Sequence, residues 1–131
     1  MAIDPHTQPS PLVVCLCAAW CGVCRDYRSR FEQVRVQVQA SQPQTRFLWI
    51  DVEDEADLLH PLDDVEDFPT LLLAAGDQAR FFGPLTPQAE TLERMIRIKL
   101  QDDTAAALTQ HDVTALVARI RAAYPDTAQA D

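Results

Sequence analysis

Glycine is scarce in this chain of 131 residues, which contains only three. Nucleotide-binding loops need several glycines to bring the backbone close to phosphates, so a nucleotide site is not expected. No apolar run is long enough to span a membrane. Residues 1–11 contain no lysine or arginine, so the basic flank of a secretory leader is missing as well. We therefore expect a cytoplasmic protein with no membrane partner.

Positive charge is also in short supply, with 11 Lys and Arg against 20 Asp and Glu and a formal net charge of −9. Phosphate backbones are bound by clustered lysine and arginine, so nucleic acid is not an expected partner. The acidic residues concentrate between Asp51 and Asp67. A solvated loop is the ordinary interpretation of such a run, and a surface that selects basic partners is the alternative.

Four cysteines lie within ten residues, at Cys15, Cys17, Cys21 and Cys24. A disulfide scaffold spreads its cysteines along the chain, so this clustering indicates redox chemistry or a metal site. Four thiolates could in principle hold zinc or an iron–sulfur cluster. Metal is the less favoured alternative, because residues 12–20 have the pattern of a buried strand. We expect no metal ligands and no cofactor.

The hydrophobic pattern predicts a βαβ unit with the cysteines at its first turn. Residues 12–18 are continuously apolar, which is typical of a strand buried on both faces, and Cys15 and Cys17 share one of these faces. Apolar residues at three- and four-residue intervals predict a helix over residues 22–40. The remaining elements are expected as follows: a strand over 46–52, a short helix near 54–60, strands over 70–75 and 79–83, a helix capped by Thr86, and a last helix over about 110–123 with a capping box at Thr109–Asp112.

Cys21 and Cys24 lie where the first strand gives way to the helix. A thiol at this place meets the unpaired N–H groups of the helix start, and the positive end of the helix dipole favours its thiolate. The thiolate is the form that attacks in thiol–disulfide exchange. Cys24, one turn along, could then close a disulfide with Cys21 and release the partner.

Three segments, in order, resemble the thioredoxin family. Residues 19–25 (Ala-Trp-Cys-Gly-Val-Cys-Arg) are similar to the family's Trp-Cys-Gly-Pro-Cys-Lys. Residues 68–70 (Phe-Pro-Thr) resemble its hydrophobic-Pro-Thr segment with a cis proline, and residues 83–86 (Gly-Pro-Leu-Thr) resemble the turn that leads into its next helix. The resemblance covers roughly residues 12–100.

This resemblance implies a three-layer α/β/α sandwich with a mixed sheet of about four strands. The strand and helix that begin the family's domain are missing, and an extra C-terminal helix is present. We accordingly expect a disordered arm or tag over residues 1–11, a thioredoxin-like domain over 12–101, and a helical extension over 102–131 that packs on the same domain.

The activity implied by the resemblance is thiol–disulfide exchange with disulfides of partner proteins, acting as a reductase that a reductase system recycles. Cys21 would attack and Cys24 would resolve. The expected client-contacting residues are Trp20, Gly22, Val23, Phe68 and Pro69. A non-catalytic adaptor or chaperone with the same fold is the alternative, because a fold alone does not determine function.

The departures from the family concern the surroundings of the dithiol. Cys15 occupies the position of a buried Asp that helps to move the resolving thiol's proton, and Cys17 replaces an aromatic residue. Cys15 and Arg25 are expected to modulate the redox chemistry. Because burial in apolar surroundings raises a thiol's pKa, Cys15 is a poor base and we expect slow resolution. Buried structural roles are favoured for Cys15 and Cys17, and disulfide exchange between Cys15 and Cys24 is the alternative.

Overall fold

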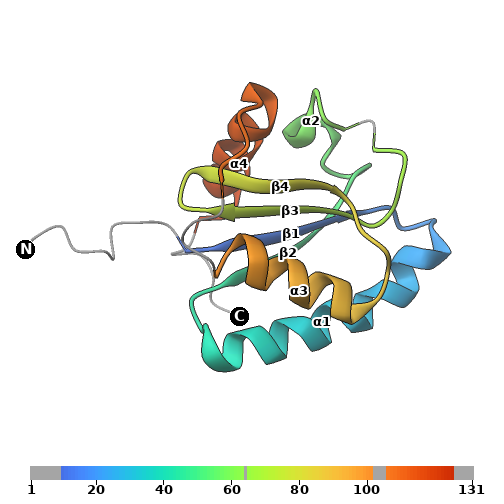
Figure 1. The fold of residues 1–131 in the computed structure, drawn as a ribbon. Coiled ribbons are helices and arrows are strands. Elements are labelled where there is room, and N and C mark those ends of the chain that lie inside the picture. The colour runs from blue at the N-terminus through green and yellow to red at the C-terminus, as the bar shows by residue number, and fades with distance from the viewer. Residues whose placement is uncertain (1–9, 64, 102–105, 126–131) are drawn as a thin grey trace, which may run out of the picture.

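A four-stranded mixed sheet lies between two layers of helices in the computed structural model, which describes residues 10–63, 65–101 and 106–125 (Figure 1). The strand order is β2-β1-β3-β4, with β1 parallel to β2 and antiparallel to β3, and β3 antiparallel to β4. The strands are β1 (Leu12–Cys17), β2 (Arg46–Asp51), β3 (Thr70–Ala75) and β4 (Gln78–Pro84). The expected four-stranded mixed sheet is confirmed.

Helices α1 and α3 cover one face of the sheet, and α2 and α4 cover the other (Figure 1). The helices are α1 (Gly22–Ser41), α2 (Ala56–Leu59), α3 (Ala89–Lys99) and α4 (His111–Ala123). This arrangement confirms the three-layer sandwich. No strand or helix precedes β1 in the described residues, which begin at Ser10.

Strand β1 is buried along its whole length, as its continuous apolar run predicts. Its side chains alternate between two separate apolar clusters. Leu12, Val14 and Leu16 pack into the cluster shared with α4. Val13, Cys15 and Cys17 pack into the cluster shared with α1 and α3. The strand therefore directs two of the four cysteines toward α1.

Helix α1 begins directly after Cys21, which is its N-cap residue, and follows the predicted range closely. One stripe of its side chains is buried against the sheet: Cys24, Tyr27, Phe31, Val34 and Val38. The helix is 20 residues long. Neither it nor any other helix of the described ranges is both long and apolar enough to cross a membrane.

Helix α3 begins two residues later than expected, with Gln88 as its N-cap residue. The predicted cap at Thr86 is wrong. The Thr86 hydroxyl instead shares a hydrogen bond of 2.9 Å with the hydroxyl of Thr91. Gln88 has the extended backbone of an N-cap residue and makes no side-chain cap bond, so the helix starts without the hydroxyl cap that the sequence suggests.

Helix α4 packs on the sheet face opposite α1, through Val113, Leu116, Val117 and Ile120. Its N-cap is Gln110, without a side-chain cap bond, so the predicted capping box is wrong. Arg121 of this helix donates a 2.6 Å hydrogen bond to the carbonyl of Ser10. Most of the expected arm over residues 1–11 lies outside the described residues, but its last two residues are held: the carbonyl of Pro11 accepts from the backbone N–H of Arg46 at 2.9 Å.

Two valines on α1 provide a matched test of this packing. Val34 is fully buried and Val36 is 59% exposed. We expect Val34→Ala to lower the free energy of unfolding by about 2 kcal/mol, because it removes buried methyl groups and leaves a cavity. Val36→Ala should change it by less than about 0.5 kcal/mol. Urea unfolding measures both, and equal losses would contradict the orientation of α1.

Candidate redox site

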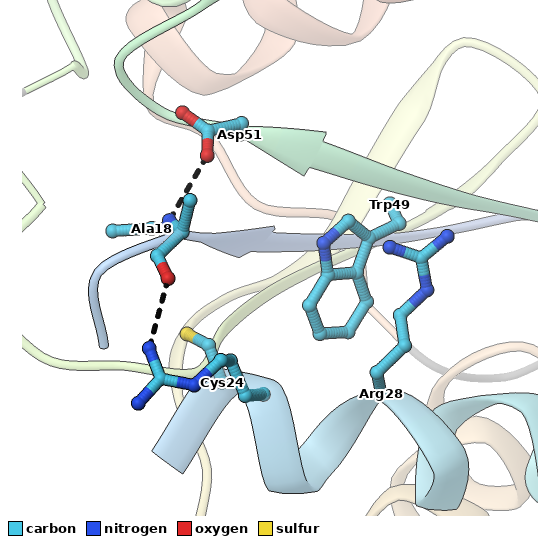
Figure 2. Close-up of a pocket in the computed structure, with 7 residues that line it drawn as sticks. Ala18, Cys24, Arg28, Trp49 and Asp51 are labelled. Carbon is cyan, nitrogen blue, oxygen red and sulfur yellow. Dashed lines mark hydrogen bonds between the residues drawn. The ribbon is translucent and has the colours of Figure 1, made fainter. Parts of the chain in front are cut away.

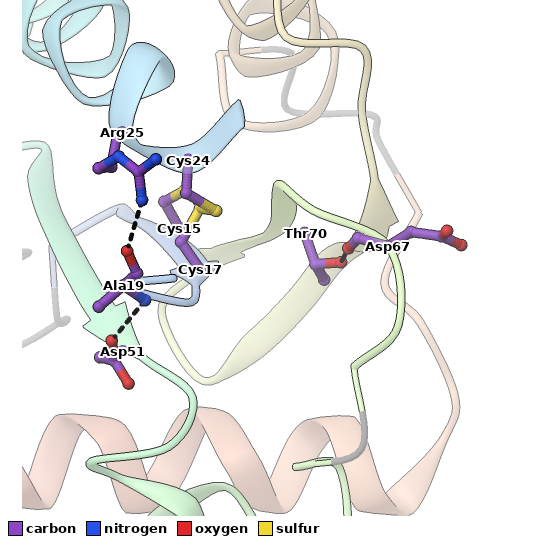
Figure 3. Close-up of a disulfide and its surroundings, with 8 residues drawn as sticks. All are labelled: Cys15, Cys17, Ala19, Cys24, Arg25, Asp51, Asp67 and Thr70. Atoms are coloured by element: carbon purple, nitrogen blue, oxygen red, sulfur yellow. Dashed lines mark hydrogen bonds between the residues drawn. A yellow bond between two sulfur atoms is a disulfide. The ribbon is translucent and has the colours of Figure 1, made fainter. Parts of the chain in front are cut away.

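A disulfide joins Cys17, the last residue of β1, to Cys24 in the first turn of α1 (Figure 3). The two Cα atoms are 5.8 Å apart, within the range that a disulfide can bridge. Cys21, the expected partner of Cys24, is a free thiol. The structure therefore shows Cys24 bonded to Cys17, and the exchange between Cys21 and Cys24 stays a prediction. Cys17 is not the unpaired structural thiol that we expected.

The physical reason for this pairing is the direction of the side chains. Cys17 projects from β1 toward α1, and Cys24 projects from α1 toward the sheet, so both enter the same apolar cluster. They are 1% and 2% exposed. Cys21 has extended backbone geometry as the N-cap residue and is only partly buried. The spacing along the sequence favoured Cys21 as the partner of Cys24, whereas the burial of both side chains in the core favours Cys17.

Cys15 lies next to this disulfide, with its Sγ atom 3.7 Å from the Sγ atom of Cys17. Because a bonded sulfur carries no proton, the thiol of Cys15 is the donor in this contact. Burial raises the pKa of Cys15 well above its usual range, although the positive charge of Arg28 acts in the opposite direction. Cys15 is therefore a neutral thiol, as the sequence predicts for a buried cysteine.

Tyr27 adds a second buried polar group to this side of the core. Its hydroxyl has no hydrogen-bond partner among the residues that the structure describes. Burial raises the pKa of Tyr27, and the neighbouring Cys15 raises it further. The sulfur atoms thus lie in surroundings that disfavour negative charge.

Asp51, at the end of β2, holds together the two loops beside the disulfide (Figure 3). One carboxylate oxygen accepts from the backbone N–H of Ala19 at 3.0 Å. The other accepts from the N–H groups of Glu53 at 2.8 Å and Asp54 at 3.0 Å. Sequence analysis missed this role because Asp51 belongs to the acidic run that suggested a solvated loop. The available signal was its position at the carboxyl end of the strand that is paired with β1.

Arg25 completes this connection from the helix side. Its guanidinium donates a 3.1 Å hydrogen bond to the carbonyl of Ala19. The loop between β1 and α1 is therefore fixed by Arg25 at one backbone group and by Asp51 at another. The role of Arg25 that the structure shows is to position this loop.

Two of the expected client-contacting residues meet at the surface near Cys21. The ring of Trp20, which is 63% exposed, makes an edge-on contact with the ring of Phe68 at a centroid distance of 5.7 Å. The indole N–H of Trp20 donates to the carboxylate of Glu53 at 2.9 Å. Gly22 and Val23 are exposed beside Cys21.

Pro69 lies buried behind Phe68, and the peptide bond between the two residues is cis. The carbonyl of Pro69 accepts a 3.2 Å hydrogen bond from the N–H of Leu85. The hydroxyl of Thr70 donates to the carbonyl of Asp67 at 2.6 Å and thereby holds the preceding loop (Figure 3). A second cis bond, between His60 and Pro61, was not predicted.

A cavity of about 470 Å³ opens between α1 and β2 (Figure 2). It is lined by Ala18, Ala19, Cys24, Arg25, Arg28, Trp49 and Asp51. The guanidinium of Arg28 lies 4.7 Å from the centre of the Trp49 ring, in a cation–π contact. Within the described ranges, no three His, Cys, Asp or Glu side chains are grouped so as to hold a metal ion.

Three features of the fold can be compared with known proteins. They are the cysteine pair at the start of α1, the cis proline before β3 and the strand order β2-β1-β3-β4. The thioredoxin family model matches residues 5–97. The chain belongs to the thioredoxin family. Among curated proteins, none matches this sequence.

Solved thioredoxins share the fold at low sequence identity. Mitochondrial thioredoxin 3 of Saccharomyces cerevisiae, in its oxidised form, is 27% identical, with a TM-score of 0.56 over 69% of this chain and 79% of that chain. Thioredoxin of Trypanosoma brucei brucei is 17% identical, with a TM-score of 0.60 over 72% and 79%. The germline-specific thioredoxin Deadhead of Drosophila melanogaster is 19% identical, with a TM-score of 0.57 over 70% and 82%. Family membership and the bonded cysteine pair support an oxidoreductase activity in general terms.

Replacing Asp51 tests its role in joining the two loops. We expect Asp51→Ala to lower the free energy of unfolding by about 2 kcal/mol, because three backbone N–H groups lose their acceptor. Amide hydrogen exchange at Ala19, Glu53 and Asp54 should become faster. Asp51→Asn is the matched control, since it retains one carbonyl oxygen and should lose less. Unchanged stability and exchange in Asp51→Ala would refute this role.

The buried thiol of Cys15 predicts a pH dependence. In the unfolded chain Cys15 loses its proton near its usual pKa of about 8.5, whereas the folded protein retains the proton. The stability that Cys15 contributes is therefore complete below pH 8.5 and falls as the pH rises, by about 1.4 kcal/mol per unit. Urea unfolding measures this in two proteins that both carry Cys21→Ser, one with Cys15 and one with Cys15→Ala. Between pH 8 and pH 10 the free energy of unfolding of the protein with Cys15 should fall by about 2 kcal/mol relative to that of the Cys15→Ala protein. Parallel stability curves for the two proteins would contradict a buried, protonated thiol.

Proposed function

We propose that this protein exchanges electrons with disulfides of partner proteins, and that it acts as a reductase in the cytoplasm. The observation that carries the proposal is the state of Cys21. Of the four cysteines, Cys21 alone is not buried, and it is a free thiol at the N-terminus of α1. A client disulfide can reach this sulfur without any rearrangement of the core.

The proposed reaction has two steps, which begin after the bond between Cys17 and Cys24 has been reduced. The Cys21 thiolate attacks one sulfur of a client disulfide, so that a mixed disulfide forms and the other client sulfur leaves as a thiolate. The Cys24 thiolate then attacks the Sγ atom of Cys21. This step forms the Cys21–Cys24 disulfide and releases the reduced client. A reductase system supplies two electrons to restart the cycle.

The surface around Cys21 favours an extended client segment. The aromatic edge formed by Trp20 and Phe68 offers an apolar contact on one side. Backbone next to a cis proline can pair with an added strand, which is a form of β-augmentation. The carboxylates between Asp51 and Asp67 lie in the adjoining sequence and favour clients with basic side chains.

Catalysed reduction of insulin by dithiothreitol tests the proposal. We expect Cys21→Ser to catalyse the reduction at least about tenfold more slowly than the wild type, because the variant lacks the sulfur that attacks the client disulfide. Turbidity of the released insulin B chain measures the rate. Val36→Ala is the matched control, since this exposed residue lies on the same helix away from the cysteines.

Equal activity of the wild type and Cys21→Ser would contradict the exchange mechanism. That outcome would favour the alternative of a non-catalytic adaptor or chaperone, in which the same surface binds clients without chemistry. A loss in Val36→Ala as large as that in Cys21→Ser would indicate a general defect in folding and would remove the support for a specific nucleophile.

A further inference from the structure

We propose that Cys17 is a third redox-active sulfur, which takes over the disulfide from Cys21 after exchange with a client. The inference rests on the proposed function. The Cys17 thiolate attacks the Sγ atom of Cys24 in the Cys21–Cys24 disulfide. A bond forms between Cys17 and Cys24, the bond between Cys21 and Cys24 breaks, and Cys21 leaves as a thiolate. No electrons are gained or lost, and the proton released by Cys17 passes to solvent or to Cys21.

The geometry supports this step because Cys24 is bonded to one partner and lies close in sequence to the other, at the start of the same helix. Its bond to Cys17 is present in the structure. Cys21 precedes it by three residues, a spacing at which side chains are neighbours on a helix. Cys21 also packs against the apolar cluster that contains Cys17 and Cys24. Migration of the bond therefore takes place among three sulfur atoms that belong to, or pack against, the same apolar cluster.

The preferred direction of the exchange follows from which cysteine is left unbonded by each of the two disulfides. With the bond between Cys17 and Cys24, the apolar cluster contains the two bonded sulfur atoms and the neutral thiol of Cys15, and the other free thiol is the partly exposed Cys21. With the bond between Cys21 and Cys24, the remaining thiol is Cys17, whose 1% exposure matches the burial of Cys15. The exchange step consumes a thiolate at Cys17 and releases one at Cys21. Because burial disfavours the thiolate at Cys17, this step runs toward the inner bond.

Cys15 assists the step without exchanging electrons. Its thiol lies 3.7 Å from the Sγ atom of Cys17 and can donate to the thiolate that Cys17 must form. Arg28 acts on the same place with a positive charge, as its effect on Cys15 indicates. A hydrogen bond to a thiolate lowers the free energy of the thiolate, so that Cys17 can form its nucleophilic state although it is buried.

The consequence is an oxidised protein that still presents a nucleophile. In this state Cys24 is occupied, so a mixed disulfide formed by Cys21 cannot be resolved from within the protein. The oxidised form holds clients covalently, and the reduced form releases them.

Peptide mapping of the oxidised wild-type protein tests the proposal. The protein is oxidised with diamide, treated with N-ethylmaleimide under native conditions, then denatured and digested with chymotrypsin. Cleavage after Leu16, Trp20 and Tyr27 places Cys17 in one peptide and places Cys21 with Cys24 in the next. We expect these two peptides to be joined through Cys17 and Cys24, with one maleimide on Cys21. A closed Cys21–Cys24 loop within one peptide and no native labelling would overturn the proposal.

Two alanine variants provide the matched comparison. In oxidised Cys17→Ala the bond should lie between Cys21 and Cys24, and native labelling of Cys21 should fall at least tenfold relative to oxidised wild type. Oxidised Cys15→Ala should retain the inner bond. Undiminished labelling in Cys17→Ala would contradict the transfer, and the wild-type map decides the pairing even if Cys17→Ala does not fold.

The two proposals fail in different measurements. If Cys21→Ser reduces insulin as fast as the wild type, the proposed function fails. If the wild type requires Cys21 for insulin reduction but its oxidised form contains the Cys21–Cys24 loop, the proposed function stands and the role of Cys17 is refuted.

Discussion

The burial of β1 on both faces is the constraint on which the site depends. A strand in the middle of a three-layer sandwich must send alternate side chains into the two helical layers, so Cys15 and Cys17 enter the layer of α1. Helix α1 sends Cys24 into the same layer. Three sulfur atoms are thereby enclosed where charge is costly, and the fourth, on Cys21, is left at the boundary with solvent. The distribution of chemical roles among the cysteines follows from this division.

Much of the fold could be predicted because its signals are local. A continuous apolar run specified β1, and a single apolar stripe specified α1 within a residue or two. The start of α3 could not be predicted, because its N-cap residue, Gln88, makes no side-chain cap bond and so leaves no capping signal in the sequence. The partner of Cys24 was also missed, because spacing along the chain does not reveal how deeply a helix sits against a strand. Asp51 escaped notice because one of its hydrogen-bond partners, Ala19, is 32 residues away from it in sequence.

The acidic segment after β2 is structurally uneven, although its composition is uniform. Asp51 binds three backbone N–H groups, and Glu53 accepts from the indole of Trp20. These two carboxylates act as fixed acceptors that orient the loop and the aromatic ring beside Cys21. The same segment includes Glu55, which is hydrogen-bonded to the side chain of Tyr124, and Asp63, which contacts the ring of His60. A charge run that composition alone assigns to solubility therefore contains several positions with structural partners.

The bond between Cys17 and Cys24 also closes a small covalent ring, because the two cysteines are only seven positions apart. Cys21 lies inside this ring, together with the exposed Trp20 and Val23. Reduction of the disulfide gives the enclosed segment more conformational entropy. The rigidity of this segment therefore depends on the redox state of the protein. By linkage, a binding partner that prefers the stiffened segment makes the protein harder to reduce, and one that prefers the loosened segment makes it easier. Binding of a partner and the reduction potential of the disulfide are therefore coupled through this one loop.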